Sequence, residues 1–314
     1  MNNMILHAHP TGNANAHHAA QALAEADLLA EFLTCLAPRP EAAWLRVLPP
    51  SVQRQILRRA IPESIRPFTH LHPWRELGRM ACSSIGWMGP LKKERGICSI
   101  DAVYRSLDRA ATRRLQKHPQ LRAVYLYEDG AADTFNAARK LGLHTFYDLP
   151  IGHWQAARNL LGEEAELQPS WASTLHGNTD SADKLARKDR ELSQADTVIV
   201  ASTFTKSTLD ILPNAPRDII TIPYGAPSQA PNLKPARRAQ GEPLRVLFVG
   251  SLGQRKGLSY LLDAMEMVGS GHELTLIGKP QGDHCHPLDQ ALHKHRHIPS
   301  LPHHEILKEM IRAR

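Results

Sequence analysis

Short apolar runs alternate with helical patterns along nearly the whole chain, and this alternation restricts the possible fold more than any other feature. The runs NMILHAH at 3–9, LRAVYLYED at 121–129 and DTVIVAS at 196–202 have the length of single strands. Apolar residues at helical spacing follow at 131–142 and occur again at 184–195. Strands that alternate with helices in this way are typical of an α/β fold with a largely parallel sheet.

The other elements of the first half follow the same rule. Alanine and leucine at helical spacing predict one helix over 16–32. HTFYDLP at 144–150 and DIITIPYG at 218–225 predict two further strands. Ser202 is placed to cap a helix over 204–212, because a serine hydroxyl accepts hydrogen bonds from the free N–H groups of the first turn.

A change of composition divides the chain after residue 225. Residues 226–243 hold four prolines and no apolar periodicity, as expected of a linker. We therefore predict a first domain at 1–225 and a second at 244–314. The second domain offers only two or three strands, whereas a doubly wound domain has about five or six. We expect it to be incomplete.

Positive charge is concentrated in one stretch. The chain has a formal net charge of +7, and residues 51–118 hold 14 Lys and Arg against 5 Asp and Glu, so the rest of the chain sums to about −2. A localised basic region favours an anionic partner, although a solvated face accounts for it equally well.

The four cysteines indicate the compartment. Cys35, Cys82, Cys98 and Cys285 form no CxxC pair, which favours reduced thiols in a cytoplasmic protein. The N-terminus shows no secretory signal, and no apolar run reaches the roughly 18–20 residues of a membrane span. We expect a cytoplasmic protein, with any membrane contact peripheral.

The segment RVLFVGSLGQRKGLSYLLDAMEMV at 245–268 is the first candidate site. An apolar run ends at Gly250, a turn holds Arg255 and Lys256, and a helical pattern begins near Gly257. A helix N-terminus with adjacent cations suits an anion. The spacing matches neither a P-loop nor the dinucleotide fingerprint, and the alternative is two cations that simply face water.

This segment strongly resembles the start of the C-terminal domain in the GT-B retaining glycosyltransferases of group 1, also called family 4. Four other segments resemble family motifs in the expected order. These are the glycine loop at Gly12, KDRELSQADTVIVASTFTKSTL at 188–209, TIPYGAP at 221–227 and IPSLPHHEILKEMIRA at 298–313. The resemblance spans nearly the whole chain.

The resemblance implies two Rossmann-like domains with parallel sheets. It also implies transfer of a sugar, with retention, from a UDP- or GDP-linked donor to a glycan or lipid-linked acceptor, without a metal or other cofactor. Polysaccharide or glycoconjugate biosynthesis is the expected setting. In such enzymes the donor lies between the domains, and its diphosphate contacts the C-terminal one.

The resemblance also assigns donor-side residues. Lys256 matches the phosphate-binding lysine of the family. Ser251 occupies the position after the strand-ending glycine where the family usually has arginine, and Arg255 is a candidate to replace that arginine. Gly12 and Asn13 are expected to line the cleft beside the donor.

On the acceptor side the sequence departs from the family. Many relatives have a catalytic histidine after the strand that matches 144–150; Asp148 lies nearest to that position, and His153 follows. Either residue is a catalytic candidate, and the alternative is a strand-end carboxylate and a surface histidine. Glu128 and Asp129 end another strand and are expected on the acceptor side, since ligands of open α/β sheets bind at strand carboxyl ends.

A third departure concerns the donor domain. The family has an E-x7-E motif after the helix that matches 303–314, and no such motif follows here. We therefore expect a glycosyltransferase truncated in its donor domain. The alternative is a catalytically inactive binding or interaction remnant.

The remaining expectations concern metals and partners. Eight His and Cys residues at 284–304 include an H-C-H triplet, which is too tight for a tetrahedral site, so no metal is expected. Relatives that act on lipid-linked acceptors often use a basic amphipathic surface, which predicts peripheral contact of residues 51–118 with anionic membrane, at the inner face. Nucleic acid is not expected, because no binding module is recognised and aromatic residues make up only 5%.

Overall fold

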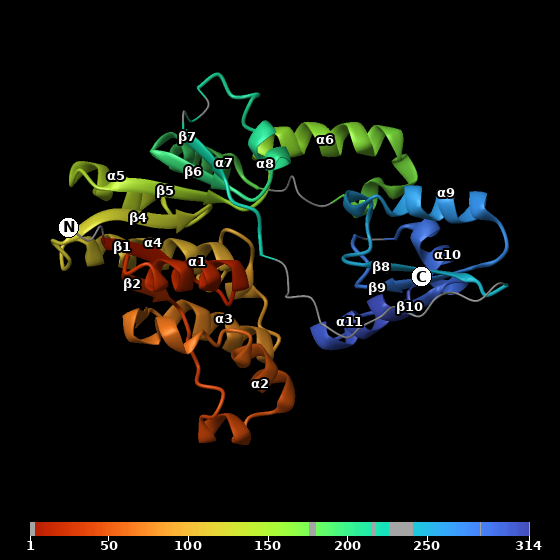
Figure 1. Cartoon of the computed structure of the whole chain (residues 1–314), viewed down its shortest axis with the longest axis horizontal. Helices are drawn as coiled ribbons and strands as arrows, with labels where there is room; N and C mark the ends of the chain where they lie inside the picture. Colours follow the sequence, from red (N-terminus) through yellow and green to blue (C-terminus); the bar gives the residue numbers. More distant parts are fainter. Residues whose placement is uncertain are drawn as a thin grey trace. The chain divides into compact units, whose positions relative to one another are not determined.

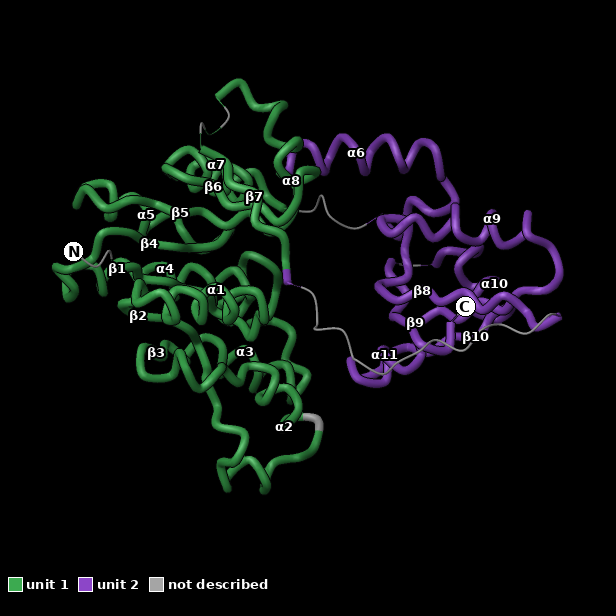
Figure 2. The backbone as a smooth tube through the Cα atoms, viewed as in Figure 1, with its two compact units in different colours: residues 1–153, 180–224 green, residues 154–179, 225–314 purple. Residues whose placement is uncertain are grey.

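The computed structural model describes residues 4–175, 180–214, 216, 218–225, 241–282 and 284–313. The chain forms two compact units: unit 1 comprises Met1–His153 and Asp180–Tyr224, and unit 2 comprises Trp154–Thr179 and Gly225–Arg314 (Figure 2). The sequence-based division instead placed 154–179 in the first domain. Most of the expected linker, residues 226–240, lies outside the described residues.

Unit 1 is built on a seven-stranded sheet in which all neighbouring strands are parallel (Figure 1). The spatial order is β3-β2-β1-β4-β5-β6-β7. The strands are β1 (Met4–Ala8), β2 (Leu29–Thr34), β3 (Thr69–Leu71), β4 (Leu121–Tyr127), β5 (His144–Leu149), β6 (Thr197–Val200) and β7 (Asp218–Thr221). The step from β1 to β4 reverses the direction in which strands are added, as in a doubly wound sheet.

Helices cover both faces of this sheet. They are α1 (Ala14–Glu25), α2 (Pro50–Leu57), α3 (Trp74–Ser84), α4 (Ile100–Leu115), α5 (Ala132–Lys140), α7 (Ala182–Ser193) and α8 (Thr203–Ser207). Side chains of β4 alternate between the faces: Val124 and Leu126 share a core cluster with residues of α4 and α5, and Ala123 packs in a cluster with Ala19 and Leu23 of α1. The predicted α/β class is confirmed.

The segment 16–32 does not form the single helix that its alanine and leucine spacing predicted. Helix α1 ends at Glu25, and Asp27 adopts a positive φ of 55°. The Leu28 N–H then bonds back to the Leu23 carbonyl, and residues from Leu29 onwards pair with β1. The prediction was wrong because the apolar run suits a helix and a strand equally well. Its burial between β1 and β3 decides for the strand.

Unit 2 has a three-stranded parallel sheet in the order β10-β9-β8. Its elements are α6 (Trp154–Leu167), the 3-10 helix η4 (Pro169–Thr174), β8 (Leu244–Val249), the 3-10 turn η5 (Gln254–Lys256), α9 (Leu258–Val268), β9 (His272–Ile277), α10 (His286–Lys294), β10 (Arg296–Ile298) and α11 (His303–Arg312). The count of three strands agrees with the two or three expected.

A tryptophan far from the C-terminal segment in sequence holds unit 2 together. Trp171 of η4 is 3% exposed and packs in one core cluster with Leu252, Leu258, Leu276 and Leu288. The Sγ of buried Cys285 lies 3.4 Å from the Ser170 carbonyl oxygen. This burial is what joins 154–175 to unit 2, because an aromatic ring of this size contributes much of a small core.

Candidate functional site

The turn from β8 to α9 has the geometry predicted for 245–268. Gly250 at the strand end has φ 155° and Gly257 at the helix start has φ 68°, backbone conformations that other residues rarely adopt. Gly278, which follows β9, packs on this turn: a Cβ there would lie 1.7 Å from the Gly250 carbonyl oxygen. Only glycine fits between the two strand ends.

Gln254 holds this turn in place, a role that no pattern in the sequence indicated. It is 2% exposed, and its Oε1 accepts the Ser259 N–H at 3.0 Å in the first turn of α9. Its Nε2 donates to Glu164 Oε1 at 2.6 Å, and its own N–H donates to Thr174 Oγ1 at 2.9 Å. These bonds tie the turn to α6 and η4.

The three donor-side candidates of this turn lie together at the carboxyl end of β8. Arg255 and Lys256 are exposed and form no ion pair with any carboxylate that the structure describes, while Ser251 is half-buried. Parallel strands bind ligands at their carboxyl ends, and α9 begins directly after the turn with no side-chain cap from Gly257. Two unpaired cations therefore stand beside a helix N-terminus.

In unit 1, Asp148 is a buried carboxylate at the end of β5. It is 9% exposed and accepts a hydrogen bond from the Tyr125 hydroxyl, with 2.6 Å between Oη and Oδ2. Burial raises its pKa to about 6, although the hydroxyls of Tyr125 and Tyr127 lower it. A carboxyl group that titrates near neutral pH suits proton transfer or a hydrogen bond to a sugar hydroxyl.

Two buried histidines, which sequence reasoning missed, contact the tyrosine rings of β4. The His7 ring stacks between Phe32 and Tyr125, with ring centroids 5.3 and 4.7 Å apart, and its Nε2 bonds the Ala16 carbonyl. His9 lies edge-on to Tyr127 at 4.8 Å. Burial lowers the pKa of His7 to about 3 and of His9 to about 4, so both rings are neutral.

Gly12 and Asn13 form the loop between β1 and α1. A Cβ on Gly12 would lie 2.0 Å from the Arg58 carbonyl oxygen, so the loop packs directly on the end of α2. Asn13 is the N-cap of α1, and its Oδ1 accepts the Asn15 N–H at 2.9 Å. The structure thus gives both residues a local structural role at the carboxyl edge of the sheet.

Glu128 and Asp129 face cations of α7. Lys188 lies 3.4 Å from Glu128, Arg187 contacts Asp129 at 2.9 Å, and Lys184 lies 3.5 Å from Asp129. Burial raises the pKa of Glu128 to about 7, although Lys188 lowers it. Each carboxylate already has an ion-pair partner, which weakens the case for Glu128 and Asp129 as acceptor-side residues.

Glu191 also lies on α7 and caps another helix. Its side chain is fully buried and accepts N–H groups of Asp129, Ala131 and Ala132 at 2.8, 3.2 and 3.3 Å at the start of α5. Burial raises its pKa to about 8, although Arg187 lowers it. The helical spacing of 184–195 gave no indication of this cap, because the capped N–H groups lie about 60 positions away in sequence.

His153 is not a surface histidine. It is 2% exposed, its N–H donates to Thr208 Oγ1 at 3.0 Å, and its Nε2 lies 3.4 Å from Asp189. Burial lowers its pKa, and Asp189 opposes that effect. The enclosed position and its existing partners favour a role in packing over contact with a substrate.

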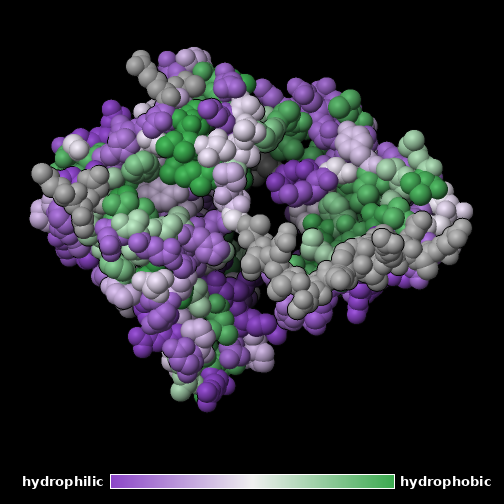
Figure 3. Space-filling view, viewed as in Figure 1, coloured by the Kyte–Doolittle hydropathy of each residue, from purple (hydrophilic) through white to green (hydrophobic). Residues whose placement is uncertain are grey.

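The basic stretch also exposes large apolar side chains. Trp74, Trp87, Met88 and Ile97 are 76, 61, 68 and 65% exposed. Exposed cations, among them Lys92 and Arg95, lie in the same segment. Figure 3 shows hydrophilic and hydrophobic side chains intermingled over the visible face of unit 1.

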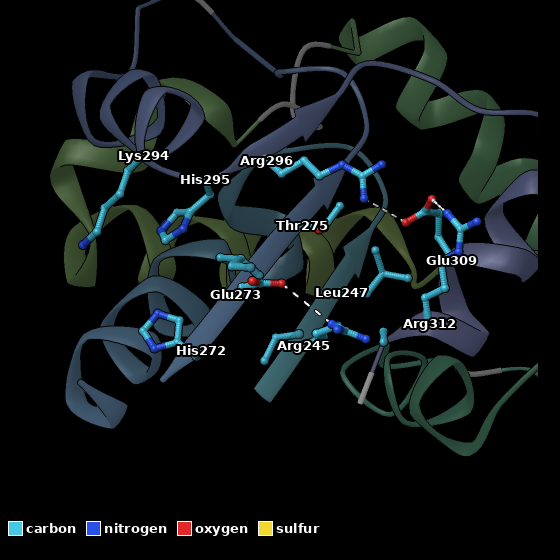
Figure 4. Close-up of a pocket in the computed structure, with 13 residues that line it drawn as sticks. Arg245, Leu247, His272, Glu273, Thr275, Lys294, His295, Arg296, Glu309 and Arg312 are labelled. Atoms are coloured by element: carbon cyan, nitrogen blue, oxygen red, sulfur yellow. Dashed lines mark hydrogen bonds and ion pairs between the residues drawn. The ribbon is translucent and has the colours of Figure 1, made fainter. Parts of the chain in front are cut away.

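A pocket of about 700 Å³ lies elsewhere, on the sheet of unit 2. Its walls hold Arg245, Glu273 and Arg296 from the first halves of the three strands, with Glu309 and Arg312 of α11 (Figure 4). The charges pair among themselves: Glu309 contacts Arg296 at 3.1 Å and Arg312 at 3.0 Å, and Arg245 lies 3.8 Å from Glu273. This pocket lies at the amino ends of the strands, away from Lys256.

The histidine-rich segment does not gather metal ligands in the described part of the chain, where no group of three or more His, Cys, Asp or Glu is placed to hold an ion. His297, for example, bonds the Gly278 carbonyl at 2.9 Å. All four cysteines are free. Among the described residues, no helix is both long and apolar enough to cross a bilayer.

No protein-family model matches the chain, and no curated protein matches it. Solved structures, by contrast, match the chain. A Phytolacca americana UGT2, described as complexed with UDP-2fluoro-glucose and pterostilbene, matches with a TM-score of 0.50 and 14% identity over 96% of this chain and 72% of that one. A Polygonum tinctorium UDP-glucosyltransferase matches with a TM-score of 0.47, 13% identity and 96 and 72% coverage. Acinetobacter baumannii MurG matches with a TM-score of 0.43, 13% identity and 99 and 71% coverage.

The first of these structures, together with the two parallel sheets, assigns the chain to the GT-B fold. Unit 1 is a Rossmann-like unit with a seven-stranded sheet, and unit 2 is a Rossmann-like unit with a three-stranded sheet. Family 4 was expected from the sequence, but an identity of 14% shows the fold and not the family.

Proposed function

We propose that this protein transfers a sugar from a UDP- or GDP-linked donor to an acceptor hydroxyl. The observation that supports this most is the β8–α9 turn at the carboxyl end of a parallel strand. Arg255 and Lys256, which have no ion-pair partner among the described residues, stand there at a helix N-terminus. The Phytolacca americana protein of the same fold is described as complexed with UDP-2fluoro-glucose. Negative charge grows on the diphosphate as the glycosidic bond breaks, and cations held in advance stabilise it.

Asp148 is the proposed catalytic residue of unit 1. Its buried carboxylate is held by Tyr125 and has a pKa near neutrality, so it can accept a proton from, or hydrogen-bond to, a sugar or acceptor hydroxyl. Ser251 contributes a hydroxyl on the donor side. His153, Glu128 and Asp129 act as supports rather than as groups that contact substrate, because each has a partner within the unit.

The stereochemical outcome is proposed from the resemblance of 245–268 to family 4, which favours retention. The same resemblance favours a glycan or lipid-linked acceptor in polysaccharide or glycoconjugate synthesis and requires no cofactor. The anomeric proton coupling of the product, measured by NMR, tests retention. An inverted product would contradict the family 4 assignment and leave sugar transfer itself intact.

For a lipid-linked acceptor, we propose that unit 1 contacts anionic membrane through Trp74, Trp87, Met88 and Ile97 and the cations around them. Large apolar side chains at the interface and Lys or Arg beside acidic headgroups are the usual combination in peripheral binding. We propose that it acts in the cytoplasm, at the inner face of the membrane.

Calorimetry with UDP and with GDP tests donor binding. We expect saturable binding of one of them, weakened about ten- to hundredfold by Lys256→Ala, since a charge-assisted bond to phosphate contributes about 1.5–3 kcal/mol. Lys294→Ala is the matched control, because Lys294 is an exposed lysine of unit 2 at the end of α10. Equal affinity in wild type and Lys256→Ala would contradict the proposed site.

A binding protein without transfer activity is the second candidate, favoured by the three-stranded sheet of unit 2. It predicts nucleotide binding without release of UDP or GDP from the nucleotide-sugar when acceptor is added. A coupled assay for the released nucleotide separates the two candidates.

A further inference from the structure

A cationic pocket lies in unit 1, whereas the donor-side turn belongs to unit 2. It has a volume of about 320 Å³, and Thr11, Gly12, Arg58, Arg59, Arg79 and Ser83 are among the residues that line it. These residues come from the β1–α1 loop, from the end of α2 and from α3. The pocket therefore opens beside the carboxyl edge of the sheet, one residue from Asn13.

A buried carboxylate holds two of the three arginines in place. Glu76 is fully buried; its Oε1 accepts Arg59 Nε at 2.9 Å, and its Oε2 accepts Arg79 Nε at 2.7 Å. The two guanidinium groups lower the pKa of Glu76 although burial raises it, so Glu76 is ionised at neutral pH. One carboxylate shared by two guanidiniums leaves one positive charge without a partner.

The third arginine is not neutralised. Arg58 is exposed and forms no ion pair with any carboxylate in the described ranges. Three guanidiniums and one carboxylate give the pocket a net charge of about +2, and the hydroxyls of Thr11 and Ser83 add neutral donors. Guanidinium forks are suited to planar or tetrahedral oxyanions, and this net charge matches a phosphate monoester dianion.

The position of the pocket is rigid. Gly12 packs so closely on Arg58 that a Cβ would overlap the Arg58 carbonyl, and Arg59 also donates to the Gln55 carbonyl. The side chains of Arg59 and Arg79 are therefore held by Glu76 before any ligand binds, which reduces the entropy lost on binding.

We propose that this pocket binds a phosphate monoester, and that it selects acceptors bearing such a group next to the hydroxyl that receives the sugar. The phosphate site stands on the pocket itself, whereas its assignment to the acceptor rests on the proposed function. The phosphate belongs either to a soluble phosphorylated sugar or alcohol, or to a lipid headgroup.

The test is a titration of the full-length, ¹⁵N-labelled protein with glycerol 3-phosphate, observed at the amides of Thr11 and Gly12, with glycerol as the neutral control. We expect saturable chemical-shift changes at these amides with glycerol 3-phosphate and none with glycerol. Arg58→Gln should weaken them about tenfold or more, since it removes a charge-assisted bond. Arg54→Gln, an exposed arginine of α2 that does not line the pocket, should change the affinity by less than about twofold.

Vesicles distinguish the two sources of the phosphate. Phosphatidylcholine vesicles with phosphatidic acid present the same monoester at a membrane. Competition of glycerol 3-phosphate with these vesicles, lost in Arg58→Gln, indicates the headgroup; binding of the soluble phosphate without competition indicates a soluble acceptor. No shift at Thr11 and Gly12, or equal weakening by Arg54→Gln and Arg58→Gln, would overturn the proposal.

Nucleotide titration on the same sample keeps this proposal separate from the proposed function. UDP or GDP is expected to act at 250–258, and Lys256→Ala should leave the phosphate shifts at Gly12 intact. Phosphate binding without nucleotide binding would support the pocket and contradict sugar transfer. Nucleotide binding without phosphate binding would support sugar transfer and contradict the phosphate pocket.

Discussion

The hydroxyl of Tyr125 donates to the carboxylate of Asp148 across neighbouring strands, with 2.6 Å between the oxygens. Both residues are at most 9% exposed, and they belong to β4 and β5, whose carboxyl ends lie at the same edge of the sheet. The bond holds a carboxylate at the position where doubly wound sheets bind ligands, without neutralising it by a cation.

Asp148→Asn should reduce the pH dependence of stability. The pKa of Asp148 in the folded protein, about 6, exceeds the ordinary value of 3.8, so the ionised carboxylate destabilises the fold above about pH 6 and this cost disappears as the pH falls. The free energy of unfolding of the variant, relative to that of wild type, should therefore be higher at about pH 8 than at about pH 4.5. The change between the two pH values should be no more than about 3 kcal/mol. Urea unfolding of both proteins at both pH values measures this change. The same difference between variant and wild type at both pH values would contradict the raised pKa of Asp148.

In a transfer assay the same substitution should lower kcat with little effect on nucleotide affinity. An amide accepts the Tyr125 hydrogen bond as the carboxylate does, but it cannot take a proton. We expect a loss of about 10²–10⁴-fold in kcat, typical of removing a general base. Asp196→Asn, a half-exposed carboxylate of the same unit, is the control.

Gly12→Ala should destabilise unit 1 by about 1–3 kcal/mol. The new Cβ would lie 2.0 Å from the Arg58 carbonyl, so either the loop or the end of α2 must shift. The shift should also weaken phosphate binding at Arg58. Gly162→Ala, where a Cβ meets open space, should leave stability unchanged or raise it, and thermal unfolding of the two variants provides the comparison.

Gln254→Ala should destabilise unit 2. It leaves the Ser259 N–H without its acceptor and Glu164 without the Gln254 donor, at a cost of about 1–3 kcal/mol. Hydrogen exchange should show faster opening of α6 and α9, with the amides of β4 and β5 unchanged. Uniform acceleration in both units would contradict a role limited to the turn.

Glu191→Ala should cost about 2–4 kcal/mol, because three N–H groups at the start of α5 lose their acceptor inside the core. Glu191→Gln should restore part of this loss, since its amide oxygen still accepts. Chemical denaturation of the two variants gives the difference. Equal losses in the two variants would contradict the role of the hydrogen bonds from these N–H groups.

Trp87→Ser together with Met88→Ser should reduce sedimentation with anionic vesicles at least about tenfold, because two apolar side chains leave the interface. Leu141→Ser, an exposed apolar residue of unit 1 outside the basic stretch, is the matched control. Unchanged sedimentation of the double variant would contradict the membrane surface.

Local patterns in the sequence were sufficient for the fold class and for most of the elements. Apolar runs predicted β1, β4, β5, β6, β7 and β8, and Ser202 caps α8 with a bond to the Thr205 N–H at 3.0 Å, as expected. The order of strand, turn and helix predicted for 245–268 is also found, and Gly250 and Gly257 of that turn have positive φ. Periodicity and glycine spacing succeed here because they depend on neighbours within one or two turns of chain.

The tertiary structure decided what depends on residues far apart in sequence. It placed 154–174 in unit 2 through Trp171, turned residues 29–34 into a strand beside β1, and gave Glu76 two arginines to hold. It also distinguished Asp148, which has a raised pKa and a tyrosine partner, from His153, which is enclosed and paired. The sequence by itself determined which segments fold into strands, helices and turns, whereas burial and charge pairing across the fold determined which of its polar residues remain free to act on a ligand.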